Sequence, residues 1–244
     1  MKTAEENIFE ALEQGSWLEV FADDCTDDWR KQWALDGKKT SIYHNEKGME
    51  IQAGPVHLED ASHAVLWTQQ SFSGDIRIEY DYTRLDNISR GVNILYIQAT
   101  GSGNGERVKD IHQWAHLREV PAMKEYFNHM NLYHISYAAH EPQANHVKDD
   151  YIRARRYVPQ SSGLEGTDLE PDTFSTNLFA EGEVHHFTVI KRGNQLAMRI
   201  VNDSQTATFA WSNEGLPPIE EGCIGFRHMH QRMARYANIK IYTT

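Results

Sequence analysis

The sequence predicts an all-β fold, in which short antiparallel strands form a sandwich or barrel. Residues 76–83 alternate strictly between apolar and polar side chains, as a strand with one buried face does. Further short strand-like segments recur along the chain, with turn residues between them. The 244 residues are within the range of a single all-β domain, so we expect residues 1–244 to form one domain.

The individual elements follow from local patterns. One short helix is expected at residues 4–13, where Ile8, Phe9 and Leu12 share an apolar face. Arg192-Gly193-Asn194 predicts a hairpin between two late strands. Long loop insertions are expected at 101–130, with a possible helix at 108–118, and at 141–150 and 159–183. The expected strands are 76–83, 92–99, 133–139, 186–191, 197–202, 206–211, 224–228 and 237–242.

Charge and composition exclude several classes of partner. The formal net charge of −11 repels nucleic acid and anionic membrane surfaces, so neither is an expected partner. No stretch is long and apolar enough to span a bilayer, and the amino terminus lacks the pattern of a signal peptide. We therefore expect a cytoplasmic protein in which Cys25 and Cys223 are reduced. The oligomeric state stays open.

Several segments together resemble the YesU-like family of concanavalin A-like proteins. They are Phe21-Ala22-Asp23-Asp24, Ala53-Gly54-Pro55, Ser62 to Trp67, Phe72-Ser73-Gly74-Asp75, Gly225-Phe226-Arg227 and Arg235 to Ile239. The resemblance covers nearly the whole chain. It implies a jelly-roll sandwich of two antiparallel sheets with long loop insertions and a few short helices. It also implies a concave face that holds sugar, and a link to the use of acidic polysaccharides.

The densest candidate site lies between residues 133 and 157. If residues 151–157 are extended, Tyr151, Arg153, Arg155 and Tyr157 share one face. Guanidinium groups bind carboxylates as bidentate forks, and tyrosine offers a stacking ring and a proton donor. The spacing is similar to a Tyr-x-Lys-x-x-x-Tyr segment of jelly-roll alginate lyases, although the other strand motifs of that family are missing. A solvated basic strand with tyrosine packing at its edges is an equally good interpretation.

A β-elimination would need a base and an acid beside the bound uronate. His134 and Tyr137 could serve, with Tyr151 and Tyr157 as further proton carriers. However, His134 and Tyr137 have opposite parity on a straight strand, so one of them is expected in the core unless a bulge re-aims it. For either residue alone, a core role is the simpler interpretation.

Other polar residues complete the list of candidates. Trp114, in a long insertion, is expected to face a ligand, and His228 with His230 are expected to line a polar cleft. We predict no metal site and no cofactor. Acidic residues near the amino terminus, Asp23 and Asp24, leave room for a structural calcium ion.

Three functions remain open at this level. The first is an enzyme acting on acidic, uronate-containing oligosaccharides by β-elimination, with Arg153 and Arg155 holding the uronate. The second is a non-catalytic, lectin-like carbohydrate-binding domain. The third is a glycoside hydrolase. The strand Glu79-Tyr80-Asp81 resembles the start of the carboxylate motif of such enzymes, but Thr83 and Arg84 occupy the positions where the second acid is needed.

Overall fold

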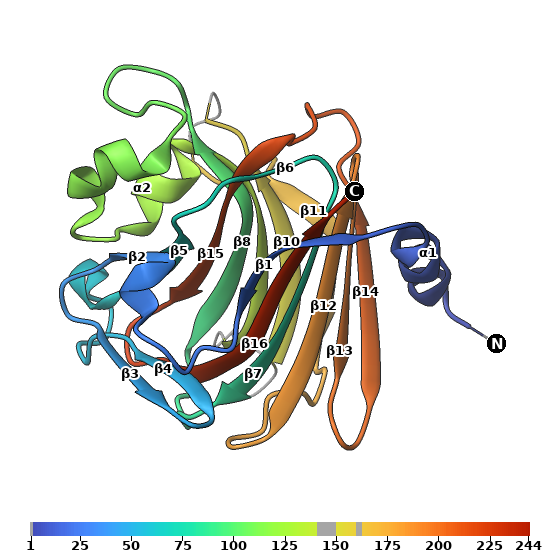
Figure 1. The fold of residues 1–244 in the computed structure, drawn as a ribbon, viewed down its shortest axis with the longest axis horizontal. Helices are drawn as coiled ribbons and strands as arrows, with labels where there is room; N and C mark the ends of the chain where they lie inside the picture. Colours follow the sequence, from blue (N-terminus) through green and yellow to red (C-terminus); the bar gives the residue numbers. More distant parts are fainter. Residues whose placement is uncertain (1, 141–149, 160–162) are drawn as a thin grey trace.

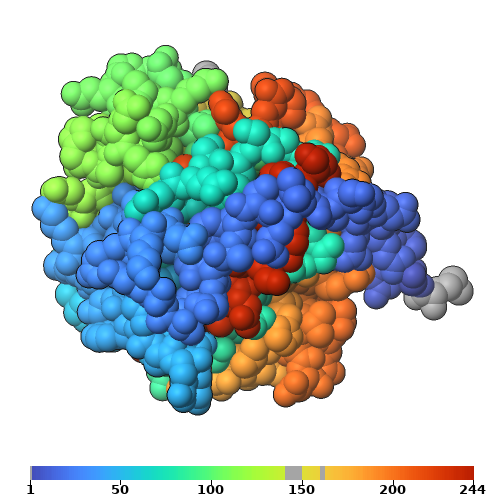
Figure 2. All heavy atoms as spheres, viewed as in Figure 1, coloured from blue at the N-terminus to red at the C-terminus, as the bar shows by residue number. Residues whose placement is uncertain are grey.

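Two antiparallel sheets pack face to face in the computed structural model, which describes residues 2–140, 150–159 and 163–244. The predicted jelly-roll sandwich is therefore confirmed. Both sheets contain strands from distant parts of the chain, and the amino-terminal strand pairs with the carboxy-terminal one. Figure 2 shows these two segments, blue and red, side by side on the surface.

The first sheet runs in the order β14-β13-β12-β7-β16-β4-β3, and β1 also pairs with β16 (Figure 1). Its strands are β1 (Leu18–Asp23), β3 (Ser41–Asn45), β4 (Gly48–Gln52), β7 (Ile76–Arg84), β12 (Val184–Arg192), β13 (Gln195–Val201), β14 (Thr206–Ser212) and β16 (Met233–Thr243).

The second sheet runs in the order β11-β10-β9-β8-β15-β5-β2, and β6 also pairs with β15. Its strands are β2 (Trp33–Asp36), β5 (Ala64–Thr68), β6 (Phe72–Ser73), β8 (Gly91–Gly101), β9 (Met130–His140), β10 (Asp150–Tyr157), β11 (Asp168–Phe174) and β15 (Glu221–His228).

The main core lies between the sheets and follows the predicted alternation. Ile76, Ile78, Tyr80 and Tyr82 of β7 all point into it and are buried. Arg77, Glu79 and Asp81 between them lie on the outer face, where ion pairs and hydrogen bonds hold them. Burial of this apolar face, at about 25 cal/mol per Å², is the main force that holds the sheets together.

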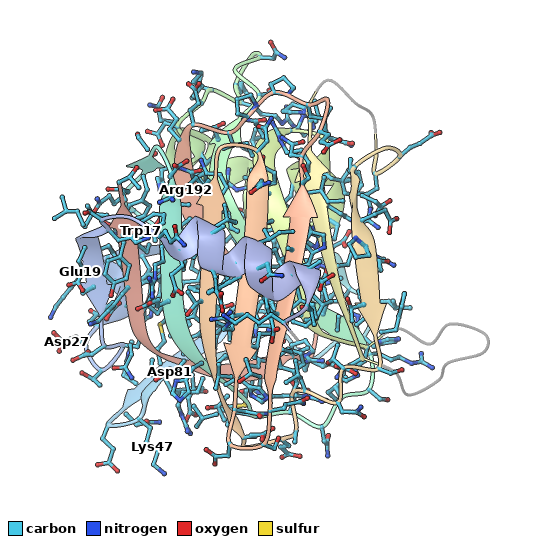
Figure 3. All side chains as sticks on the ribbon, turned by 90° about the vertical axis from the view of Figure 1, so that its right-hand side faces the viewer. Trp17, Glu19, Asp27, Lys47, Asp81 and Arg192 are labelled. Carbon is cyan, nitrogen blue, oxygen red and sulfur yellow. The ribbon has the colours of Figure 1, made fainter. Side chains whose placement is uncertain are left out.

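The outer faces of the two sheets are covered differently. Helix α1 (Ala4–Glu13) begins with a capping box made by Thr3 and Glu6 and lies across β12, β13 and β14 of the first sheet (Figure 3). Figure 3 also shows Trp17 and Arg192 beside this helix, where the guanidinium lies 4.9 Å from the indole ring. The helix predicted at 4–13 is confirmed.

A second hydrophobic cluster covers part of the outer face of the second sheet. It is formed by a 3₁₀ segment, η3 (Ile111–Arg118), and by helix α2 (Met123–Phe127), which lies outside β5, β15 and β8 in Figure 1. Trp114 and Tyr126 are fully buried here, against Trp67 and Tyr96. The helix expected at 108–118 is a kinked 3₁₀ segment, because Trp114 has non-helical dihedral angles. The remaining short 3₁₀ segments are η1 (Trp29–Lys31) and η2 (Asp60–Ser62).

The two cysteines lie apart and unbridged, each buried in a different hydrophobic cluster. In the described part of the chain, no helix has the length and apolar character needed to cross a membrane.

Candidate functional site

A cavity of about 370 Å³ opens on the outer face of the second sheet, beside the cluster that holds α2. Its floor consists of side chains from β8, β9 and β10, and its rim comes from loops at residues 57–58, 90–91 and 229–230 and from Met123 and Leu164. The described residues that line it are His57, Leu58, Arg90, Gly91, Val92, Ile94, Met123, His134, Ser136, His140, Tyr151, Arg153, Arg155, Tyr157, Leu164, Met229 and His230.

Strand β10 supplies one side of this cavity, as the alternation of residues 151–157 predicts. Tyr151, Arg153, Arg155 and Tyr157 all line it. The intervening Ile152 and Ala154 point into the core between the sheets. The guanidinium of Arg156 points away from the cavity, because it donates to the backbone carbonyls of Tyr157 and Pro217 beside a separate hollow.

The register of the strands fixes where these side chains stand. Arg155 pairs with His134 of β9, and Arg153 pairs with Ser136. Ser136 in turn pairs with Ile94 of β8. Arg153, Ser136 and Ile94 therefore form a row across β10, β9 and β8, with about 4.8 Å between neighbouring strands.

His134 is at the centre of the floor, and both of its ring nitrogens are hydrogen-bonded. Nδ1 lies 2.6 Å from the hydroxyl of Tyr157, and Nε2 lies 2.6 Å from the hydroxyl of Ser136. Burial, with the nearby guanidinium groups of Arg155, Arg227 and Arg153, lowers the pKa of His134 well below its usual value. Burial also raises the pKa of Tyr157 well above its usual value. Both groups are therefore neutral near pH 7, and the floor is a chain of neutral donors and acceptors.

Two of the guanidinium groups are already paired with carboxylates. Arg153 donates through Nε and Nη2 to the same Oδ2 of Asp172, at 2.8 and 2.6 Å. Arg155 lies 2.9 Å from Asp168. Asp168 and Asp172 both belong to the edge strand β11, so the pairs hold the two arginines upright on the sheet. Much of their charge is neutralised locally.

Two further arginines near the cavity are not paired with a carboxylate among the described residues. Arg90 is exposed at the rim and pairs with no carboxylate among the described residues. Arg227 is fully buried beneath the neighbouring surface, where it donates to the carbonyl of Pro121 and contacts His63, and its Nε and Nη1 have no partner in the described structure. Arg90 is not predicted from the sequence, since its position after Asn87-Ile88-Ser89 carries no motif.

The structure corrects the assignment of Tyr137. Its side chain lies in the core between the sheets, where its hydroxyl is 3.0 Å from that of Tyr236. His134 and Tyr137 thus stand on opposite faces of β9, as their parity indicates. A bulge does occur in this strand at Ala138, which has a φ of 43°, so that Tyr137 and Ala138 both face the core between the sheets. His140, the last residue of the strand, lines the cavity.

Trp114 and His228 are also corrected, because neither reaches the cavity. Trp114 is fully buried and donates from Nε1 to the carbonyl of Val108 at 2.9 Å. His228 is buried with its Nε2 at 2.9 Å from the hydroxyl of Tyr236, in the core between the sheets. His230, two residues later in the turn after β15, does line the cavity.

Histidines collect at the rim that His230 occupies. The ring of His230 lies 4.6 Å from that of His57 and 5.7 Å from that of His63. Burial and the guanidinium of Arg227 lower the pKa of His63 to about 3. Burial and Arg84 lower the pKa of His140 to about 4. His63 and His140 are therefore neutral at neutral pH.

No group of three or more potential metal ligands occurs in the described residues. Asp23 and Asp24, considered above for calcium, use carboxylate oxygens to accept hydrogen bonds. Asp23 accepts from the backbone of Cys25 and the indole of Trp33, and Asp24 accepts from Thr26.

The carboxylates considered for a glycoside hydrolase lie elsewhere. Glu79 and Asp81 are on the outer face of the first sheet, on the far side of the sandwich from the cavity (Asp81 is labelled in Figure 3). Glu79 is held by Arg77 and Tyr242, and Asp81 by His186 and Asn238. Among the described residues that line the cavity there is no Asp or Glu.

Comparisons with known proteins place this sandwich among lectin-like folds. A crystal structure from Bacillus subtilis, described as a protein of unknown function with a galectin-like fold, is 17% identical, with 93% of this chain and 98% of that chain covered and a TM-score of 0.67. Lectin II from Ulex europaeus is 11% identical over 92% and 98% of the two chains, with a TM-score of 0.58. A Lotus tetragonolobus seed lectin is 8% identical over 92% and 97%, with a TM-score of 0.59.

The fold defines a lectin-like β-sandwich with a basic cavity on one outer face. Residues 23–241 match the model of a family described as a domain of unknown function, DUF1961, and the chain belongs to this family. The resemblance to YesU-like proteins is thereby confirmed. No curated protein sequence is significantly similar to the chain.

Proposed function

We propose that this protein binds acidic, uronate-containing oligosaccharides in the cavity on the outer face of the second sheet. One observation carries the proposal: Arg90, Arg153 and Arg155 all line a cavity that has no Asp or Glu among its described lining residues. A planar guanidinium binds a carboxylate with two parallel hydrogen bonds, which suits an anionic sugar better than a neutral one.

The neutral floor of the cavity suits the uncharged, hydroxyl-bearing part of an acidic sugar. The hydroxyls of Ser136 and Tyr157 offer donors and acceptors to sugar hydroxyl groups, and their hydrogen bonds to His134 hold them in place before the ligand arrives. Tyr151 lines the same side and is stacked against the guanidinium of Arg153 at 5.0 Å. The lectin-like fold adds to this proposal, since one of the solved structures of similar fold is described as a lectin complexed with galactose.

A second candidate is β-elimination, and the contact of His134 with Tyr157 favours it. A base and an acid 2.6 Å apart, beside arginines that neutralise a uronate, have the composition that such a lyase needs. Electrostatics weigh against it: the pKa of His134 is lowered and that of Tyr157 is raised, so neither is poised near pH 7. A bound carboxylate would offset the guanidinium charges and raise the pKa of His134 again.

The experiment is a panel of uronate-containing and neutral oligosaccharides, examined by melting temperature and by the ultraviolet absorbance of an unsaturated uronate. We expect acidic oligosaccharides to raise the melting temperature and neutral ones of equal length to leave it unchanged. A growing absorbance would establish the lyase. If neutral and acidic oligosaccharides stabilise the protein equally, or neither does, the proposal is wrong.

A further inference from the structure

Part of the cavity lining is apolar. It is formed by six side chains from five separate segments of the chain, called the apolar wall below. They are Leu58, Val92, Ile94, Met123, Leu164 and Met229. Because they converge from different segments, this surface is not the by-product of one element's buried face.

The apolar wall is matched poorly to an unmodified sugar. Sugar hydroxyls placed against it would lose hydrogen bonds to water without gaining any from the protein, which opposes binding. Carbohydrate sites usually place an aromatic ring under the C–H face of a sugar, but the tyrosines that line this cavity, Tyr151 and Tyr157, stand on β10 beside the arginines. Branched aliphatic and thioether side chains instead suit a small apolar group such as a methyl.

The position of this wall is fixed relative to the guanidinium groups. Arg153 pairs with Ser136, and Ser136 pairs with Ile94, so the two sides are two strands apart. Two strand spacings are about 10 Å between backbones. One sugar unit can span the distance between the side chains, which places the apolar group on the bound sugar or on its immediate neighbour.

Leu58 is an independent sign that this wall meets a ligand. Its side chain is 80% exposed, and its φ is 58°, a left-handed conformation that a branched residue seldom adopts. The segment that carries it is held firmly. The backbone N–H of Gly54 donates to the carbonyl of Ser62, and the carbonyl of Gly54 accepts from the N–H of Gln231. The hydroxyl of Ser62 donates to Glu59 at 2.5 Å. A leucine kept strained and exposed by a fixed loop at the mouth of a cavity is typical of a functional contact.

We propose that the cavity recognises a methyl-bearing substituent on the acidic saccharide, in addition to its carboxylate. The substituent is a methyl ether, an acetyl ester or the methyl of a deoxy sugar, and it contacts the apolar wall while the carboxylate contacts the arginines. This inference rests on the proposed function and specifies its ligand.

Calorimetric titration with matched uronate disaccharides tests the proposal. The set comprises an unmodified disaccharide and its methyl ether, acetyl ester and deoxy counterparts. At least one methyl-bearing form should bind about tenfold more tightly than the unmodified form, the size expected for one methyl group in an apolar pocket. The form with the largest gain identifies the source of the methyl.

The variant Leu58→Asn separates the wall from the rest of the cavity. Asparagine tolerates the left-handed conformation, so the variant should fold at least as well as the wild type. We expect it to lose most of the preference, measured as the ratio of the affinities for the methyl-bearing and unmodified forms. Leu18→Asn, which changes another exposed leucine on β1 outside the cavity, is the matched control and should keep the preference.

The outcomes distinguish this inference from the proposed function. Equal affinity for all four disaccharides, or tighter binding of the unmodified one, overturns the methyl proposal and leaves acidic sugar binding intact. Val92→Thr changes a second residue of the apolar wall. The methyl proposal is also overturned if both Leu58→Asn and Val92→Thr still prefer the methyl-bearing form. Failure of all four to bind contradicts the proposed function itself.

Discussion

The hydroxyl of Tyr157 lies 2.6 Å from Nδ1 of His134, and together the two residues hold the centre of the cavity floor in a neutral, hydrogen-bonded state. Tyr157 is the last residue of β10 and His134 lies within β9, so the hydrogen bond also links the two strands where the ligand is expected to bind. The first prediction concerns this contact.

Replacing Tyr157 by phenylalanine leaves Nδ1 of a buried histidine without its partner. We expect the free energy of unfolding to fall by about 1–3 kcal/mol, together with weaker binding of acidic oligosaccharides. Urea denaturation and calorimetry measure the two effects. Tyr137→Phe is the matched control, since it breaks the hydrogen bond to Tyr236 inside the core: it should lose stability but keep ligand affinity. If Tyr137→Phe weakens binding and Tyr157→Phe does not, Tyr137 and not Tyr157 contributes to the binding site.

Asp172 competes with the ligand for Arg153. Because Asp172 takes two donors of this guanidinium, Asp172→Asn should free them for a ligand carboxylate and raise the affinity for acidic oligosaccharides about three- to tenfold. The affinity for neutral oligosaccharides should stay the same. Calorimetry at constant salt measures the change. An unchanged or lower affinity for the acidic ligand would show that Arg153 supports the strand only.

Stability is predicted to fall in mild acid because of buried neutral histidines. The folded-state pKa is about 3 for His63 and about 4 for His140 and His228, in each case chiefly because burial disfavours the charged ring. The unfolded state, with a histidine pKa near 6.5, binds more protons, so this stability is complete above about pH 6.5 and is lost as pH falls towards the folded values. Between pH 6.5 and 5 each such histidine costs about 2 kcal/mol.

Urea denaturation at these two pH values checks the effect. His63→Gln should reduce the difference in unfolding free energy between pH 6.5 and 5. A pH dependence that is identical in His63→Gln and the wild type would mean that His63 titrates normally in the folded protein.

Local patterns predicted much of the fold. The alternation of 76–83 gave the correct inward face of β7, and Arg192-Gly193-Asn194 marks the turn between β12 and β13. The same period-two rule placed four residues of β10 on one face, and all four line the cavity. These predictions worked because a strand's faces depend only on neighbours in the sequence.

The rest of the site depends on contacts between distant segments, which a single sequence does not reveal. Trp114 lies in an insertion that is polar in sequence, yet this insertion folds onto the sheet and buries the indole. Ser136 is an exception, since it has the same parity as His134 and shares its face of β9. Arg90 comes from a loop without a recognisable motif. The stretch 141–149, within one of the predicted insertions, lies outside the described residues.

The account depends most on the claim that the cavity selects a carboxylate, and one calorimetric comparison tests it directly. An acidic oligosaccharide is titrated beside the same compound with its carboxylates reduced to alcohols, against the wild type and Arg90→Gln. We predict that the wild type binds the acidic form at least about tenfold more tightly, and that Arg90→Gln loses most of this difference without losing stability. Equal affinity for the acidic and reduced forms in the wild type would contradict the account.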